Sequence, residues 1–492
     1  MGVTFQDGRS GLLTDLAGYE VSSDLLRRVP RALALRYDIL AMAADGNQLT
    51  VALPPTAGDD VIDRLRLATG MQVRAVHAPV EVIRELLTSY YPDIPQTGSG
   101  AARGREDEAP AIRTVDRIHD AAVLARASDL HVEPTRERGR VRQRVDGIMH
   151  EVLDVPAELF APVVSRIKLL AGMDIADRRQ PQDGRYTFEA HGRSIDARVA
   201  SMPTIIGEKL VIRLLDHQTQ IPTPENLGMS PDTLQRFRRI SHAPHGFVIV
   251  CGPTGSGKTT TLYATLAERN LQTQNLCSVE DPVEIRISGV SQVQVNLRAG
   301  LTFASALRSF LRQDPNVIMV GEMRDCETAN VAVSAALSGQ LVMTTLHSND
   351  SVTAIDRLLE LGVERHAIAS AVTGIVAQRL VRKLCVACRE PRAVGLKHAT
   401  RFGLQDGVRI FEARGCSKCS QAGYRGRTAI FELLLVNDTI RDAIAKGAST
   451  VSIGALARAA GHAPMVVDGH QKVLAGTTSI EELQRVLAFE NP

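Results

Sequence analysis

Short, mostly apolar runs mark the strands that the middle of this chain is expected to form. The clearest are Phe247–Cys251, Leu276–Val279, Val317–Val320 and Leu341–Leu346. Runs of this kind are typical of parallel strands that helices cover on both faces. Because amphipathic stretches separate them, the sequence predicts an α/β domain with a parallel sheet from near Asn226 onward.

The same patterning divides the rest of the chain into smaller domains. Residues 1–92 alternate strand-like runs such as Leu49–Leu53 with three amphipathic stretches, Ser22–Val29, Asp59–Ala68 and Val80–Tyr90, which predicts a small α/β or α+β domain. A segment rich in Pro, Gly, Ser and Ala then predicts a flexible linker. The next segment opens with a helix and continues with strands, one of which ends in the turn Asp146-Gly147. The expected order is 1–92, a linker over 93–110, a second domain over 111–225, the α/β domain over 226–380, a cysteine-bearing module over 381–430 and a helical domain over 431–492.

Composition favours a globular protein of the cytosol. The 492 residues are 44% hydrophobic and 23% charged, and a net charge of +2 is too balanced to indicate a nucleic-acid partner. No apolar run approaches the roughly 20 residues that span a bilayer. The N-terminus lacks the apolar core of a secretory signal, and Gln6 stands where N-myristoylation needs Ser or Thr. We therefore expect membrane contact only through a partner.

Residues 252–260 form a complete phosphate-binding loop, G-x-x-x-x-G-K-T, after a predicted strand. Its glycines let backbone amides approach the phosphates, and the helix that opens near Lys258 directs further amides at the same anion. Lys258 is expected to reach the β- and γ-phosphates, and the Thr259 hydroxyl to bind Mg²⁺. The predicted ATP-binding residues are Gly252, Pro253, Thr254, Gly255, Ser256, Gly257, Lys258, Thr259 and Thr260.

Acidic and histidine side chains follow three other predicted strands. Glu280 and Asp281 follow one, Glu322 the next and His347 a third. In open parallel sheets, functional residues gather at the carboxyl ends of strands. Taken singly, the Glu280-Asp281 pair could be a solvated turn, and His347 a neighbour of a helix cap. Three such groups after one phosphate-binding loop favour a hydrolytic site.

These four blocks resemble the Walker A, Asp box, Walker B and His box motifs of the secretion ATPase superfamily, the GspE/PulE family of type II secretion and type IV pilus motors. The Walker B block departs from the usual pattern, because Gly321 intervenes and the acid is Glu322. The resemblance covers about residues 111–486. It also rests on Ala127–Pro134, Gln182–Arg185, Met202-Pro203, Gly207–Lys209, Gln378–Arg382, Gly423–Thr428 and Gly476–Glu482.

The resemblance implies a RecA-like ATPase domain, preceded by a PAS-like α+β domain, that works as a homo-hexameric ring. By motif match, Glu280 is a candidate for polarising the attacking water, Glu322 for supporting Mg²⁺ and His347 for contacting the γ-phosphate. The sequence leaves the general base open between the two glutamates.

Arginines are frequent between residues 178 and 213. In the family that the chain resembles, arginines of the domain before the ATPase domain complete the nucleotide site. By motif match these are Arg185 and Arg198, with Arg213 a third candidate. An arginine there can stabilise charge on the γ-phosphate. The alternative is a solvated sheet face, where arginine contributes little.

Four of the seven cysteines form two C-x-x-C pairs, Cys385 with Cys388 and Cys416 with Cys419, 27 residues apart. Two such pairs predict a closed tetrahedral zinc site, with a dithiol redox pair as the minor alternative. The remaining Cys251, Cys277 and Cys326 are expected to be small apolar fillers. The cysteines thus argue against a disulfide framework.

Residues 1–92 more loosely resemble the N-terminal domains by which assembly-type members dock on an inner-membrane platform. We therefore expect a cytoplasmic ATPase that is attached peripherally to the inner membrane through a partner and drives pseudopilus assembly and protein export by type II secretion. A type IV pilus assembly ATPase is the first alternative. A RecA-like nucleic-acid translocase is the second, but only 4% of residues are aromatic and none is Trp, which leaves few surfaces for stacking bases. A nucleotide-dependent scaffold with negligible turnover is the third.

Overall fold

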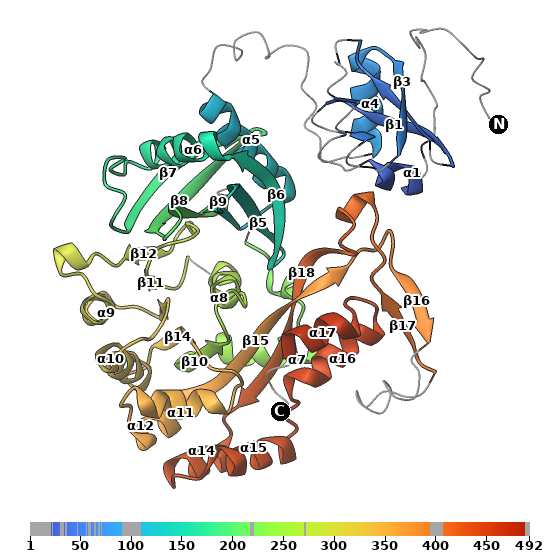
Figure 1. Ribbon diagram of the computed structural model, residues 1–492. Helices are drawn as coiled ribbons and strands as arrows, with labels where there is room; N and C mark the ends of the chain where they lie inside the picture. The colour runs from blue at the N-terminus through green and yellow to red at the C-terminus, as the bar shows by residue number, and fades with distance from the viewer. Residues whose placement is uncertain are drawn as a thin grey trace. The chain divides into compact units, whose positions relative to one another are not determined.

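The computed structural model describes residues 110–216, 221–269, 272–393 and 407–487, together with most of residues 21–90. The chain divides into two compact units, Met1–Arg126 and Ala127–Pro492. Figure 1 labels most of the helices and strands that are named below. Of the linker predicted over 93–110, only Pro110 lies within the described residues.

The first unit contains a three-stranded sheet in the order β1-β2-β3, with β1 antiparallel and β3 parallel to β2. Leu49, Val51 and Leu53 of β2 are fully buried, as are Ile83 and Leu87 of the amphipathic helix α4 that packs on the sheet. The predicted strand Leu49–Leu53 and the predicted helix Val80–Tyr90 are confirmed, whereas parts of Asp59–Ala68 lie outside the described residues. The elements are α1 (Ser23–Arg28), β1 (Leu40–Asp45), β2 (Gln48–Leu53), β3 (Gln72–His77), α4 (Val80–Tyr90) and α5 (Pro110–Ala125).

The second unit begins with an antiparallel sheet of six strands in the order β6-β5-β4-β9-β8-β7. The turn Asp146-Gly147 joins β5 to β6, and both residues have positive φ, as a tight hairpin requires. The helix α6 contacts β5, β6 and β7. The elements are β4 (Asp129–Pro134), β5 (Arg138–Val145), β6 (Ile148–Pro156), α6 (Ala157–Leu170), β7 (Gln182–Ala190), β8 (Arg193–Pro203) and β9 (Glu208–Asp216).

A seven-stranded sheet in the order β12-β11-β13-β14-β10-β15-β18 is the centre of the second unit. Its strands are parallel except β18, which runs antiparallel to β15. Alternate residues of β10 face two different cores, with Phe247 and Ile249 in one and Val248 and Val250 in the other. Burial on both faces explains why the run is apolar throughout. The strands are β10 (Gly246–Cys251), β11 (Leu276–Glu280), β12 (Ser291–Gln294), β13 (Val317–Val320), β14 (Leu341–Leu346), β15 (Val372–Leu384) and β18 (Tyr424–Leu435).

Helices cover both faces of this sheet, which confirms the predicted α/β architecture. They are η2 (Pro224–Leu227), α7 (Pro231–Ser241), α8 (Lys258–Ala267), η3 (Leu297–Ala299), α9 (Phe303–Phe310), α10 (Cys326–Leu337), α11 (Thr353–Glu360) and α12 (Arg365–Ala371).

The C-terminal helices pack against β15 and β18, the last two strands of this sheet. Helix α16 contacts β18, and α17 contacts β15. Among the described residues, none of the helices is both long and apolar enough to cross a bilayer. The elements are β16 (Glu390–Ala393), β17 (Arg409–Glu412), η4 (Ser417–Cys419), α14 (Asp438–Ala445), α15 (Thr450–Ala459), α16 (Met465–Leu474) and α17 (Ile480–Leu487).

Candidate nucleotide site and cysteine cluster

The phosphate-binding loop lies between the end of β10 and the start of α8. Gly252 and Gly257 both have positive φ. A Cβ on Gly252 would lie 2.4 Å from the carbonyl oxygen of Gln378, and one on Gly257 would lie 2.8 Å from the Gln378 Nε2. Backbone conformation and the close approach of β15 therefore both require glycine here.

Lys258 and Gln378 hold this loop in place. The Lys258 Nζ donates to the carbonyl oxygens of Gly252 at 2.8 Å and Pro253 at 2.9 Å. Gln378 donates to the Ser256 carbonyl at 2.9 Å and accepts from the Thr261 hydroxyl at 2.7 Å. In the sequence, Gln378 is part of the motif Gln378–Arg382 that carries the family resemblance. No pattern in the residues around it predicts that its side chain reaches a loop more than a hundred residues earlier.

Glu322 and His347 lie together at the carboxyl edge of the sheet. They follow β13 and β14, which are neighbours, and β14 also borders β10. The Glu322 Oε2 lies 3.8 Å from the His347 Nε2, and Arg324 also pairs with Glu322. Burial, and then the nearby Lys258 ammonium, lower the pKa of His347. Lys258, Glu322 and His347 thus converge from three adjacent strand ends.

The same surroundings also change the pKa of Lys258. Burial lowers the pKa of Lys258, and the smaller influence of Glu322 opposes this shift. A cation that is desolvated in this way gains most from a strong anionic partner.

Glu280 is placed differently from Glu322 and His347. It ends β11, which is separated from β10 by β13 and β14. Its side chain is only 2% exposed, and its carboxylate accepts hydrogen bonds from Ser278 at 2.5 Å, Gln292 at 3.1 Å and Tyr263. Asp281, the next residue, is exposed.

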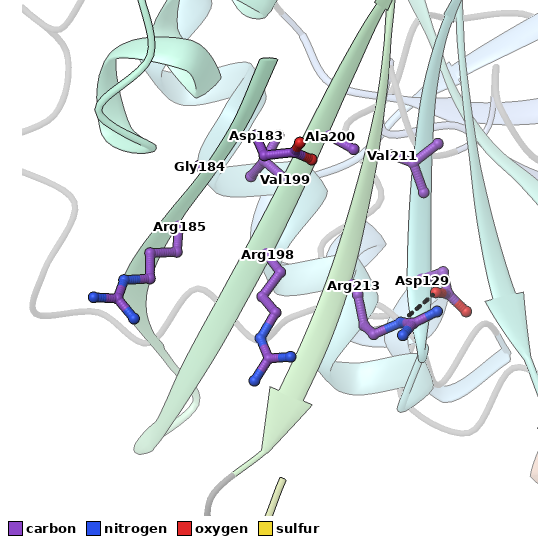
Figure 2. Close-up of a pocket in the computed structure, with 9 residues that line it drawn as sticks. All are labelled: Asp129, Asp183, Gly184, Arg185, Arg198, Val199, Ala200, Val211 and Arg213. Atoms are coloured by element: carbon purple, nitrogen blue, oxygen red, sulfur yellow. Dashed lines mark ion pairs between the residues drawn. The ribbon is translucent and has the colours of Figure 1, made fainter. Parts of the chain in front are cut away.

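Three arginines form a row across the six-stranded sheet. Arg185 on β7 is opposite Arg198 on β8, which in turn is opposite Arg213 on β9 (Figure 2). They line a pocket of about 540 Å³. The Arg213 Nε lies 3.6 Å from Asp129 Oδ1, whereas within the described part of the chain no carboxylate pairs with Arg185 or Arg198. Below, this row is called the arginine row.

The four cysteines of the two C-x-x-C pairs form one cluster. Their sulfurs all lie within 4.8 Å of one another. The Sγ atoms of Cys385 and Cys416 are 3.9 Å apart, those of Cys388 and Cys419 are 3.8 Å apart, and those of Cys416 and Cys419 are 3.7 Å apart. Zn–S bonds of about 2.3 Å in a tetrahedron place the sulfurs about 3.8 Å apart, so the donor set fits zinc.

The three remaining cysteines are not all apolar fillers. Cys251 and Cys277 are buried in the sheet, as predicted, but Cys326 is exposed at the start of α10. The prediction for Cys326 was wrong because its position follows from the capping residue Asp325, which starts the helix at the surface, rather than from apolar periodicity.

A P-loop at the end of a central parallel strand, with an acid and a histidine at the ends of the next two strands, defines a RecA-like P-loop ATPase. The family model described as Type II/IV secretion system protein matches residues 104–485, and the MshEN domain matches residues 8–97. The chain belongs to the Type II/IV secretion system protein family and hydrolyses ATP.

Curated relatives agree with this assignment. The type II secretion system protein E of Dickeya dadantii is 45% identical over 387 residues, 78% of this chain and 77% of the relative. The type II secretion system ATPase E of Vibrio cholerae is 45% identical over 384 residues, 77% of this chain and 76% of the relative. The type IV pilus assembly ATPase PilB of Myxococcus xanthus is 38% identical over 499 residues, 95% of this chain and 88% of the relative.

Solved structures support the fold. The Legionella pneumophila ATPase DotB is similar with a TM-score of 0.58 at 20% identity, over 78% of this chain and 98% of DotB. The pilus retraction motor PilT has a TM-score of 0.50 at 24% identity, over 75% of this chain and 96% of PilT. The family resemblance and the α/β fold predicted from the sequence are therefore confirmed.

Proposed function

We propose that this chain is the ATPase of a type II secretion system, in which ATP hydrolysis drives pseudopilus assembly and protein export. The convergence of Lys258, Glu322 and His347 at adjacent strand ends carries the hydrolytic part of the proposal. The similarity to type II secretion proteins of several bacteria supports the secretion part.

In this proposal the phosphate-binding loop holds the ATP phosphates and Lys258 exchanges its loop carbonyl partners for phosphate oxygens. A magnesium ion bound through Thr259 would neutralise charge on the phosphates. The oxygen of a water molecule attacks the γ-phosphorus, and the bond from that phosphorus to the β–γ bridging oxygen breaks to leave ADP and phosphate.

Glu322 is the better placed of the two glutamates to take the proton from that water. Its side chain is 18% exposed and lies beside His347, whereas both carboxylate oxygens of Glu280 already accept hydrogen bonds from protein groups. The imidazole of His347 is 51% exposed at the same edge, which supports the proposal that it contacts the γ-phosphate.

We propose that the arginine row binds phosphate charge during turnover. Like charges directly opposite one another on neighbouring strands are unfavourable, so three arginines at one level need an anion to offset their repulsion. Asp129 offsets Arg213 only, which leaves Arg185 and Arg198 as the residues available to a phosphate.

The four-cysteine cluster is proposed to hold one structural zinc ion. All four tetrahedral positions are filled by thiolates, so the metal would have no open position for a substrate and would serve to fix the module.

Partners and location are proposed from the family. The resemblance to ring-forming secretion ATPases supports a homo-hexamer, and the MshEN match supports docking on an inner-membrane platform through residues 8–97. The chain would then be cytoplasmic and held at the inner membrane peripherally. The pilus assembly ATPase remains the second candidate, because its Myxococcus relative aligns with 95% of this chain.

The experiment that tests the proposal is Lys258→Ala introduced in the native host. Loss of exported proteins from the medium, with surface pili unchanged, is the expected result. Loss of pili with normal export would favour the pilus alternative, and normal export with normal pili would overturn both.

A further inference from the structure

Tyr263 links the helix after the phosphate-binding loop to the end of β11. It lies on α8, five residues after Lys258, and is 1% exposed. Its hydroxyl donates to the Glu280 carboxylate and accepts from the backbone N–H of Glu284 at 3.1 Å. The Tyr263 hydroxyl therefore connects α8 to the last residue of β11 and to the backbone four residues further on.

Gln292, on the edge strand β12, forms hydrogen bonds with the same segment. Its amide nitrogen donates to Glu280 at 3.1 Å and to the carbonyl oxygen of Ile285 at 3.0 Å, while its amide oxygen accepts from the N–H of Ile287 at 2.6 Å. With Ser278, three side chains thus donate to one carboxylate. Burial, and then the hydrogen bond to Glu280, raise the pKa of Tyr263, so the hydroxyl keeps the proton that it donates.

Gly321, the residue before Glu322, packs against the backbone that this network fixes. The N–H of Gly321 donates to the carbonyl oxygen of Val279 at 2.8 Å. A Cβ on residue 321 would lie 3.3 Å from the Glu280 Cα, so the glycine lets the end of β13 press closely on Glu280. This close contact explains why a glycine separates Glu322 from its strand.

We propose that Tyr263 is a positioning residue of the ATPase, and that Glu280 acts with it to set the place of Glu322 rather than by activating water. The path runs from the Tyr263 hydroxyl to the Glu280 carboxylate, through the Glu280 backbone to Gly321, and on to Glu322. The proposal rests on the assignment of Glu322 as the group that accepts the proton from water.

The test compares Tyr263→Phe, Glu280→Gln and the double variant in the full-length, assembled protein with ATP and Mg²⁺. We expect each single variant to lower kcat by about tenfold or more with little change in KM for ATP. The double variant is expected to be no slower than the slower single variant, because residues that act as one unit are not additive. Thr265→Val is the matched control, since it removes another buried hydroxyl of α8, one that donates to the Thr261 carbonyl oxygen of the same helix, and it should keep normal kcat.

The pH profile separates positioning from water activation. In Glu280→Gln, the acid limb of kcat should persist, because it belongs to another group, and it should disappear in Glu322→Gln. A thousandfold loss in Glu280→Gln together with normal turnover in Tyr263→Phe would overturn the proposal, as would multiplicative losses in the double variant. A normal Glu322→Gln enzyme would instead overturn the assignment of Glu322.

Melting temperatures and a further variant distinguish a positioning role from a loss of folded protein. If Tyr263→Phe lowers the melting temperature, Gln292→Met tests the same network from the sheet edge and should also lower kcat with KM unchanged. Normal kcat in Gln292→Met would overturn the positioning role. So would losses of kcat that, in every variant, are no larger than the loss of folded protein.

Discussion

Arg185 and Arg198 lie directly opposite each other on neighbouring antiparallel strands, with no carboxylate paired to either within the described residues. Such a pair is unfavourable unless an anion comes to it, whereas Arg213 in the same row already has Asp129. The arrangement therefore ranks the three arginines by their availability to phosphate.

This ranking predicts that Arg185→Ala and Arg198→Ala lower kcat by roughly tenfold or more and leave ATP binding nearly intact, because the stabilised charge develops in the transition state. Arg213→Ala should have a smaller effect on kcat. Steady-state ATPase assays and fluorescent-nucleotide titrations measure the two quantities. Normal turnover in Arg185→Ala would remove it from the site.

Glu322→Gln should retain ATP binding and lower kcat by about a hundredfold or more, which is the usual contribution of a general base. The matched control is Glu327→Gln, an exposed glutamate of α10 that pairs with Arg308 at the surface. Single-turnover hydrolysis distinguishes the chemical step from product release. Equal rates for the two variants would contradict the assignment of Glu322.

The sequence could predict the strands of the large sheet because each is buried on both faces. The predicted run Phe247–Cys251 differs from β10 by one residue, and Val317–Val320 and Leu341–Leu346 coincide with β13 and β14. The carboxyl ends of these strands lie at one edge in any such sheet, so the sequence could predict that Lys258, Glu322 and His347 lie at that edge. Their lying on neighbouring strands depends on the order β13-β14-β10, which the sequence analysis did not predict.

Side-chain direction at that edge could not be predicted in the same way. Glu280 and Glu322 both follow apolar strands, yet Glu280 faces Tyr263 and Gln292, and only tertiary packing decides this. The contact of Gln378 with the phosphate-binding loop depends on how β15 lies beside β10, which no local pattern encodes. The assigned roles of these residues remain proposals.

Cys388→Ser should lower the zinc content from about one ion per chain to well below one and loosen the module around it. The loss follows because three thiolates and a hydroxyl bind zinc more weakly than four thiolates. Cys326→Ser is the control, since Cys326 is exposed on α10 outside the cluster, and it should keep its zinc. Elemental analysis of the purified chain gives the count. Equal zinc in both variants, or none in the unaltered chain, would contradict the site.

The stability of α5 should depend on pH through His119. Burial lowers the pKa of His119 to about 4, from an ordinary value of 6.5, so the folded helix holds the imidazole neutral. The unfolded chain takes up a proton below pH 6.5, and stability is therefore complete above that pH and is lost as the pH falls toward 4. The difference between the two pKa values corresponds to roughly 3 kcal/mol.

Hydrogen exchange of the α5 amides, corrected for the intrinsic pH dependence of exchange, measures this loss. His119→Gln has no proton to gain in this range, so the free energy of opening α5 should change less between pH 6.5 and 4 than in the unaltered chain. His366→Gln, at an exposed position of α12, should leave that pH dependence unchanged. Parallel pH profiles for His119→Gln and the unaltered chain would show that His119 does not set the acid sensitivity of α5.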